Sequence, residues 1–288
     1  MMALPLTIFF LLPILSAGQV LPSDALPPID SVCSLIKCNA SITYQQNLNQ
    51  LFLYLHANAS LSGFHTATAG QGRDQIYGLA LCRPDIPRSN CSECILQAIE
   101  VSNRTCCSYY SWYDYCLLRY STENFIGEMN NTVTIFSESG SLVPEPALFK
   151  QQLMLLMANL SSFAASNASG GLMFATGDIR LNASNNIYGL VMCTRDISFD
   201  GCRICLRGLI FHANFFTRLS DGRSVTQSCG AMYSIDPSFL HLNVAAAPPP
   251  AAPPSAHHSP KETSGTQGLM SKGNIIVAII VISYLIFG

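Results

Sequence analysis

The sequence contains one pattern twice. Residues 76–94 read IYGLALCRPDIPRSNCSEC, and residues 187–205 read IYGLVMCTRDISFDGCRIC. In both stretches a Tyr-Gly-Leu segment leads into Cys-x8-Cys-x2-Cys, and each matched cysteine is displaced by 111 positions. Self-similarity at a fixed spacing indicates a duplicated structural unit. We therefore expect two copies of one small domain, copy one at residues 30–125 and copy two at residues 146–240.

The cysteines are divided unequally between the copies, and the cellular compartment of the protein decides whether they form disulfides. Residues 1–18 begin with an uncharged apolar run and end in Ser-Ala-Gly, which is typical of a signal peptide. In an oxidising compartment, an even number of cysteines per domain favours disulfides over zinc binding or redox catalysis. Eight cysteines fall in copy one and four in copy two: Cys33, Cys38, Cys82, Cys91, Cys94, Cys106, Cys107, Cys116, Cys193, Cys202, Cys205 and Cys229.

The C-terminal region has the pattern of a membrane attachment signal. Residues 245–264 form a Pro/Ala-rich linker, and residues 265–288 end in an apolar run from 275 to 287. That run spans about 20 Å as a helix, against the roughly 30 Å of a bilayer core. Small residues, a polar spacer and an apolar tail predict GPI attachment at Ser264 or Gly265. The alternative is a short single-pass membrane helix; both place the globular part outside the cell.

Composition and motifs offer no support for catalysis. The net charge of −2 gives no basic field for binding nucleic acid. No catalytic serine motif, metalloprotease motif, phosphate-binding loop or dinucleotide fingerprint occurs. We therefore expect no enzyme activity, no catalytic residue, no cofactor and no metal site.

The repeated cysteine pattern, together with residues 112–121 (WYDYCLLRYS), resembles the plant cysteine-rich module called DUF26 or the ginkbilobin-homologous (Gnk2) domain. The resemblance covers most of residues 33–240. Two tandem copies behind a signal peptide, without a kinase, are similar to cysteine-rich repeat secretory proteins. They are also similar to the ectodomains of cysteine-rich receptor-like kinases and plasmodesmata-located proteins.

The resemblance implies an α+β fold in which each copy has an antiparallel sheet packed against two helices. It also implies an extracellular recognition role in plant defence or cell–cell signalling, with a protein partner or receptor. Two alternatives stay open at this point. One is a mannose-binding antifungal lectin-like protein, and the other is a kinase-less receptor ectodomain with a transmembrane helix.

The resemblance also implies a set of disulfide pairs. These are Cys82–Cys91, Cys94–Cys116, Cys193–Cys202 and Cys205–Cys229. Cys38 would pair with Cys106 or Cys107, which leaves the other member of that vicinal pair for Cys33. Copy two lacks the counterpart of this first bridge, so we expect it to unfold locally more easily than copy one.

Local sequence patterns agree with this fold. Residues 44–55 place one set of apolar side chains on a single helical face: Tyr44, Leu48, Leu51, Phe52 and Leu55. Residues 149–160 repeat the pattern in copy two. Second helices are expected at 91–102 and 202–213, and strands at 76–82, 116–120 and 187–193.

A carbohydrate site can be sought residue by residue. The resemblance implies a mannose-binding trio of Asn, Arg and Glu at fixed distances from the cysteines. Copy one has Asn39 but Tyr110 and Ser121 at the other two places, and copy two has Arg223 but Ser234. Asn39 and Arg223 are therefore the possible carbohydrate contacts, although neither copy completes the trio.

The aromatic run of copy one has two interpretations. Its side chains could stack on sugar faces, or in alternation they could give a strand with one buried face. The run consists of Tyr109, Tyr110, Trp112, Tyr113 and Tyr115.

N-glycosylation sequons are frequent, and glycan cover would explain how a chain with only 11% charged residues stays soluble. The predicted acceptors are Asn39, Asn58, Asn90, Asn103, Asn130, Asn159, Asn167 and Asn182.

Overall fold

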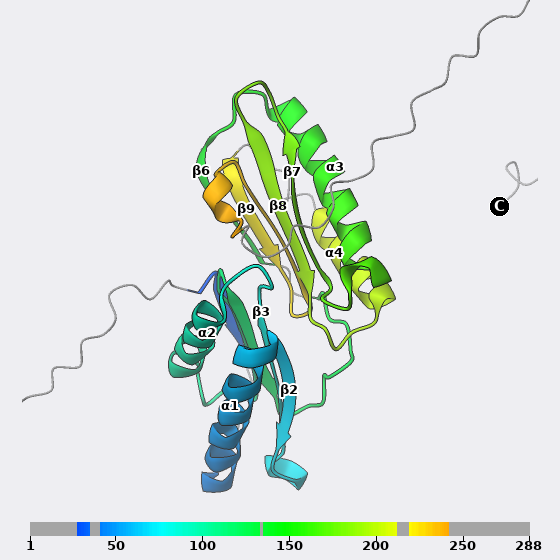
Figure 1. Cartoon of the computed structure of the whole chain (residues 1–288). Helices are drawn as coiled ribbons and strands as arrows, with labels where there is room; N and C mark the ends of the chain where they lie inside the picture. Colours follow the sequence, from blue (N-terminus) through cyan, green and yellow to red (C-terminus); the bar gives the residue numbers. More distant parts are fainter. Residues whose placement is uncertain (1–27, 35–40, 133–134, 212–218, 242–288) are drawn as a thin grey trace, which may run out of the picture. The chain divides into compact units, whose positions relative to one another are not determined.

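The computed structural model describes residues 28–34, 41–132, 135–211 and 219–241. It contains two five-stranded antiparallel sheets, and in each of them two helices cover one face (Figure 1). The α+β architecture expected from the sequence is confirmed. The predicted signal peptide, the Pro/Ala linker and the attachment residues Ser264 and Gly265 lie outside the described residues. Within the described residues, no helix is long and apolar enough to cross a bilayer.

Copy one has the sheet order β1-β4-β5-β3-β2. Its elements in chain order are β1 (Asp30–Cys33), α1 (Ile42–Ser62), β2 (Phe64–Ala69), β3 (Ile76–Cys82), α2 (Arg88–Glu100), β4 (Ser108–Trp112) and β5 (Cys116–Ser121).

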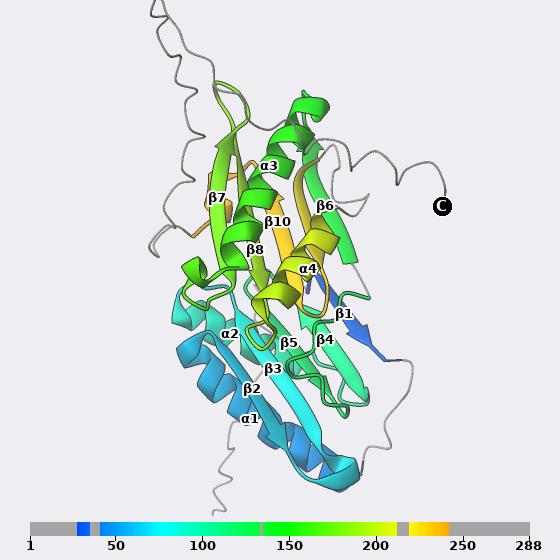
Figure 2. The ribbon, with the colours of Figure 1, turned by 90° about the vertical axis from the view of Figure 1, so that its right-hand side faces the viewer.

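Copy two repeats this topology with the order β6-β9-β10-β8-β7. Its elements are β6 (Ile135–Leu142), α3 (Pro146–Ala164), β7 (Phe174–Arg180), β8 (Asn186–Cys193), α4 (Phe199–Ile210), β9 (Leu219–Val225) and β10 (Cys229–Ser234). Figure 2 shows α3 and α4 lying on one face of this sheet.

Helix α1 forms where the apolar periodicity predicts it. The Ser41 hydroxyl caps its start by accepting from the Tyr44 amide at 2.9 Å, and Gly63 ends it in a left-handed conformation with φ 75°. All five side chains expected on its inner face are buried. In copy two, the corresponding helix α3 buries its own apolar stripe against β7 and β8.

The glycine of the repeated Tyr-Gly-Leu motif sets the distance between helix and sheet. A Cβ at Gly78 in β3 would lie 2.8 Å from Leu51 Cδ2 and 2.9 Å from Leu55 Cδ1 of α1. A Cβ at Gly189 in β8 would lie 2.9 Å from side-chain atoms of Leu156 and Met157. The motif therefore keeps glycine because the long helix lies directly on this strand.

Disulfides fasten the second helix to the sheet in the same way in both copies. The structure forms Cys82–Cys91 and Cys94–Cys116 in copy one, and Cys193–Cys202 and Cys205–Cys229 in copy two. These are the four pairs that the resemblance implies. Copy one adds Cys33–Cys106, and Cys107 is also disulfide-bonded, whereas Cys38 lies outside the described residues.

The sheet of copy two begins earlier than the domain range expected from the sequence. Strand β6 starts at Ile135 and pairs with β9, whereas the expected range starts at residue 146. The strand was not predicted because its residues are partly or fully exposed and carry no alternating apolar pattern. The segment taken as a connection between the copies thus contains an edge strand.

We expect Gly78→Ala to lower the free energy of unfolding by about 1–3 kcal/mol, because the added methyl overpacks the contact with Leu51 and Leu55. Denaturant unfolding of the secreted protein measures the change. Gly208→Ala in α4 is the matched control, since a Cβ there would meet only the flexible Asn131 side chain at 3.3 Å. An equal or smaller loss at Gly78 than at Gly208 would contradict the close-packing argument.

Candidate functional site

Strand β4 is buried on both of its faces. Tyr109 belongs to the core beneath the helices of copy one, whereas Tyr110 and Trp112 belong to a different core that includes side chains of copy two. Each of the three side chains is at most 4% exposed. The expectation of one buried face was therefore wrong, because the sheet of copy two covers the second face. These rings are not accessible for stacking on a sugar.

The faces of the two sheets that carry no helices pack against each other. Copy one contributes Leu79, Leu81, Trp112 and Leu117 to this shared core, and copy two contributes Leu190, Met192, Val225 and Met232. Trp112 is central to it: its indole Nε1 donates to the Thr226 carbonyl at 2.7 Å. The two copies accordingly belong to one compact unit.

Two aspartates at equivalent positions in the two copies bind the backbone of the segment that follows the last strand of the other copy. Asp85 of copy one accepts from the His241 amide at 3.3 Å, and Asp196 of copy two accepts from the Gly127 amide at 2.9 Å. Both follow the first cysteine of the repeated motif by three residues. Each copy thus binds the segment that follows the last strand of the other copy.

The Asp85 contact is strengthened by a buried ion pair. Arg83 Nη2 lies 2.6 Å from Asp85 Oδ2, and it also donates to the Phe239 carbonyl at 3.0 Å. Tyr115 packs edge-on against the His241 ring, with centroids 5.3 Å apart. Charge-assisted hydrogen bonds such as those of Arg83 are stronger than neutral ones.

A buried arginine lies at the shared core. Arg119 is 5% exposed, and its guanidinium sits 3.8 Å above the centroid of Phe125. Burial lowers the pKa of Arg119 to about 10, while the nearby Asp196 carboxylate acts in the opposite direction. The side chain therefore stays charged at neutral pH, and it is held largely by cation–π stacking.

The described positions of the mannose-binding trio are either buried or paired with the other copy. Arg223 Nη2 lies 2.9 Å from Asp114 Oδ1 of the other copy, and each side chain is about one third exposed. Tyr110, Ser121 and Ser234 are all buried. Asn39 lies outside the described residues. The Asp114–Arg223 pair was not foreseen, because it depends on packing between copies and not on spacing within one.

Most of the described sequon asparagines are accessible to glycan. Asn58, Asn103, Asn159 and Asn167 are exposed, whereas Asn90, Asn130 and Asn182 are half-buried. The side-chain oxygens of Asn103 and Asn130 each accept from the amide and the hydroxyl of the threonine two residues later.

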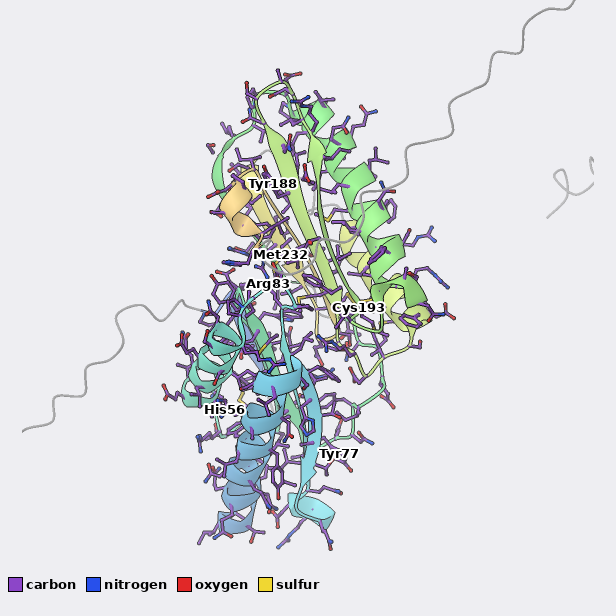
Figure 3. The ribbon with its side chains drawn as sticks, in the orientation of Figure 1. His56, Tyr77, Arg83, Tyr188, Cys193 and Met232 are labelled. Atoms are coloured by element: carbon purple, nitrogen blue, oxygen red, sulfur yellow. A yellow bond between two sulfur atoms is a disulfide. The ribbon has the colours of Figure 1, made fainter. Side chains whose placement is uncertain are left out.

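The outer surface of copy one carries a groove between α1 and α2. It has a volume of about 280 Å³, and Figure 3 labels His56, one of its residues, beside these helices. A smaller pocket of about 110 Å³ lies between α2 and the β4–β5 turn. Across the part of the chain that the structure describes, no three His, Cys, Asp or Glu side chains gather as a metal site would require.

Comparison with known proteins places these features in a family. The family model described as salt stress response/antifungal matches residues 32–123 and 137–236. The chain is 36% identical over 239 residues to an antimicrobial ginkbilobin-2-like protein of Castanea crenata, covering 81% of this chain and 96% of that protein. It is 34% identical to cysteine-rich repeat secretory protein 38 of Arabidopsis thaliana, covering 67% and 78% of the two chains.

A solved structure shows the same fold. The tandem DUF26 ectodomain of the Arabidopsis thaliana cysteine-rich receptor-like protein PDLP5 superimposes with a TM-score of 0.61 at 22% identity, covering 73% of this chain and 99% of that one. The duplicated sheets, each carrying a disulfide-linked helix, thus define a tandem DUF26 protein. The chain belongs to the salt stress response/antifungal (Gnk2/DUF26) family.

We expect Trp112→Ala to lower the free energy of unfolding by about 3–5 kcal/mol, because it leaves a cavity in the shared core. Trp112→Phe keeps most of the apolar contact and loses the bond to Thr226, which predicts a loss of about 1 kcal/mol from the missing bond. Leu155→Ala, at a side chain that is 52% exposed, is the control. Equal effects of all three changes in denaturant unfolding would refute the proposed role of Trp112.

Because Arg223 is held by Asp114 and the positions of Tyr110, Ser121 and Ser234 are buried, we expect a glycan array probed with the secreted protein to show no mannose signal. A mannose signal that disappears in Arg223→Ala or Asn39→Ala would instead support the lectin-like alternative.

Proposed function

We propose that this protein is a non-enzymatic extracellular recognition module, attached to the outer face of the plasma membrane, that acts in plant defence or cell–cell signalling. One observation carries the proposal. The apolar side chains on the helix-free sheet faces pack into the core shared by the copies, so a partner has to bind the outer surface.

That outer surface has an apolar region on helix α1. Ile42 is 80% exposed, Leu53 70% and Leu61 65%, and Tyr54 is also exposed. At 3.6 residues per turn these four side chains fall within a sector of about 120°, opposite the buried stripe. Exposed apolar side chains that share one face of a helix can form an interaction surface. We propose this sector, the outer face of α1, as the surface that binds an extracellular protein or receptor.

The names of the relatives support this class of function. One relative is described as antimicrobial and another as secretory, and the matching solved structure is the ectodomain of a receptor-like protein. An extracellular role also suits a fold whose second helices are fixed by disulfides.

Attachment to the membrane rests on the C-terminal pattern around Ser264 and Gly265. We propose a GPI anchor, with the single-pass helix as the alternative. Glycans on the sequon asparagines would keep this weakly charged ectodomain soluble. Peptide-glycosidase treatment of plant-expressed protein should then increase its electrophoretic mobility, and unchanged mobility would remove that explanation.

The outer face of α1 is tested by substitution. We expect Ile42→Glu combined with Leu61→Glu to abolish capture of the partner by proximity labelling and pull-down from plant membranes. Both side chains are exposed, so the change should leave the free energy of unfolding within about 0.5 kcal/mol. Leu155→Glu on α3 is the matched control and should retain the partner. Undiminished capture by the double variant would exclude the outer face of α1 as the binding surface.

The mode of attachment is tested by enzymatic release. A GPI anchor predicts that phosphatidylinositol-specific phospholipase C frees the protein from intact cells, and that Ser264→Trp with Gly265→Trp prevents the attachment. Protein that stays on the membrane after this treatment, while a known GPI-anchored protein is released, would favour the transmembrane helix.

A further inference from the structure

We propose that the groove between α1 and α2 of copy one binds a small amphipathic carboxylic acid, a free medium-chain fatty acid. Its hydrocarbon chain would lie between Leu53 and Leu96, and its carboxylate would pair with Arg104. This site is separate from the shared core. It also differs from the proposed protein-binding function, because its ligand is a small molecule.

The groove offers apolar walls of a suitable size. Its floor includes Phe52 and Ile99, and its rim carries Leu53 at 70% exposure and Leu96 at 42%. Covering such side chains with hydrocarbon is favourable by roughly 25 cal/mol per Å². The volume of about 280 Å³ lies just below that of pockets for drug-sized ligands. The groove therefore suits one medium-length acyl chain better than a protein segment, because a protein segment requires a far larger contact area.

The charge at one end of the groove selects an acid. The Arg104 guanidinium lies 5.4 Å from the centroid of Phe52, and its Nη1 donates to the neutral amide oxygen of Asn49. None of the four ion pairs among the described residues includes Arg104, and the groove lining contains no carboxylate. Since arginine has five N–H donors in a fork that matches a carboxylate, most of its binding capacity is available.

The two walls are held together before any ligand arrives. His56 Nε2 on α1 lies 2.9 Å from Ser92 Oγ on α2, a hydrogen bond across the groove. Helix α2 is also tied to the sheet by Cys82–Cys91 and Cys94–Cys116. A preformed site lowers the entropic cost of binding.

Copy two provides an internal comparison, because different residues stand at the equivalent positions. When the inner faces of α1 and α3 are aligned, Leu53 corresponds to Ala158 and His56 to Ser161. In the second helices, Leu96 corresponds to Arg207. The helix pair is thus shared by the two copies, while three positions of the groove differ between them.

The test is photoaffinity labelling of the full chain at the surface of plant cells. The probe is dodecanoic acid carrying a diazirine and an alkyne, and labelled peptides are located by mass spectrometry. We expect labelling in α1 and α2 of copy one. Unlabelled dodecanoate should compete at a concentration at least ten-fold lower than dodecanol, which has the same chain without the charge.

The variants separate the contributions of charge and apolar surface. Arg104→Gln keeps the Asn103 sequon and should remove the preference for acid over alcohol, weakening competition by dodecanoate at least five-fold. Leu53→Gln should reduce labelling by the probe and weaken competition by both dodecanoate and dodecanol. Two controls at exposed positions outside the groove, Arg73→Gln and Leu155→Gln, should behave as the parent protein. Secretion level and non-reducing mobility verify that each variant is folded.

Three results would overturn the proposal: equal labelling of both copies, labelling that excess dodecanoate does not reduce, or an Arg104→Gln variant that still prefers the acid. Leu53 belongs to both surfaces, so loss of protein capture in the Ile42→Glu/Leu61→Glu variant with labelling of the groove unchanged would show that the acid binds without the protein contacts of Ile42 and Leu61.

Discussion

The packing of one sheet against the other through Trp112 is the contact on which the rest of the molecule depends. A single domain of this size buries little surface on its own, and each copy here presents an apolar sheet face that its helices do not cover. Pairing the copies buries both faces at once. The polar contacts at Asp85 and Asp196 then fix the connecting and terminal segments against this pair of sheets. Duplication therefore completes a hydrophobic core as well as repeating a module.

This arrangement determines where function can lie. Side chains on the helix-free sheet faces, such as Tyr110 and Met232, would face solvent in an isolated copy but are buried in the shared core of the tandem protein. Arg223 is engaged by an aspartate of the other copy. In the proposed function, recognition falls to the outer helices, and in copy one these carry the exposed side chains Ile42, Leu53 and Leu61 and the groove between α1 and α2. The disulfides support this arrangement, because they fix the second helix of each copy to a sheet whose other face packs against the other copy.

Much of the fold could be predicted from the sequence because its signals are local. The 3.6-residue periodicity located α1 and five of its six buried residues, and the repeated motif located β3, β8 and the second helices. No strand was predicted at β1, β2, β6, β7, β9 or β10; of these, β1 has only four residues and β6 is largely exposed, so neither carries a clear periodic signal. Burial of Tyr110 and Trp112 could not be foreseen either. Their alternation was visible in the sequence, but what covers the second face depends on contacts between distant segments. The groove at Arg104 escaped prediction for the same reason.

The single tryptophan of the chain permits a direct test of this account, because Trp112 lies in the core shared by the copies. Its fluorescence and the far-UV circular dichroism should be followed together through a denaturant titration of the secreted protein. If the copies form one cooperative unit, the red shift of Trp112 and the loss of secondary structure will share one midpoint. A red shift to the emission of a solvated indole while the circular dichroism is still native would show that the sheets separate first, and would contradict the account.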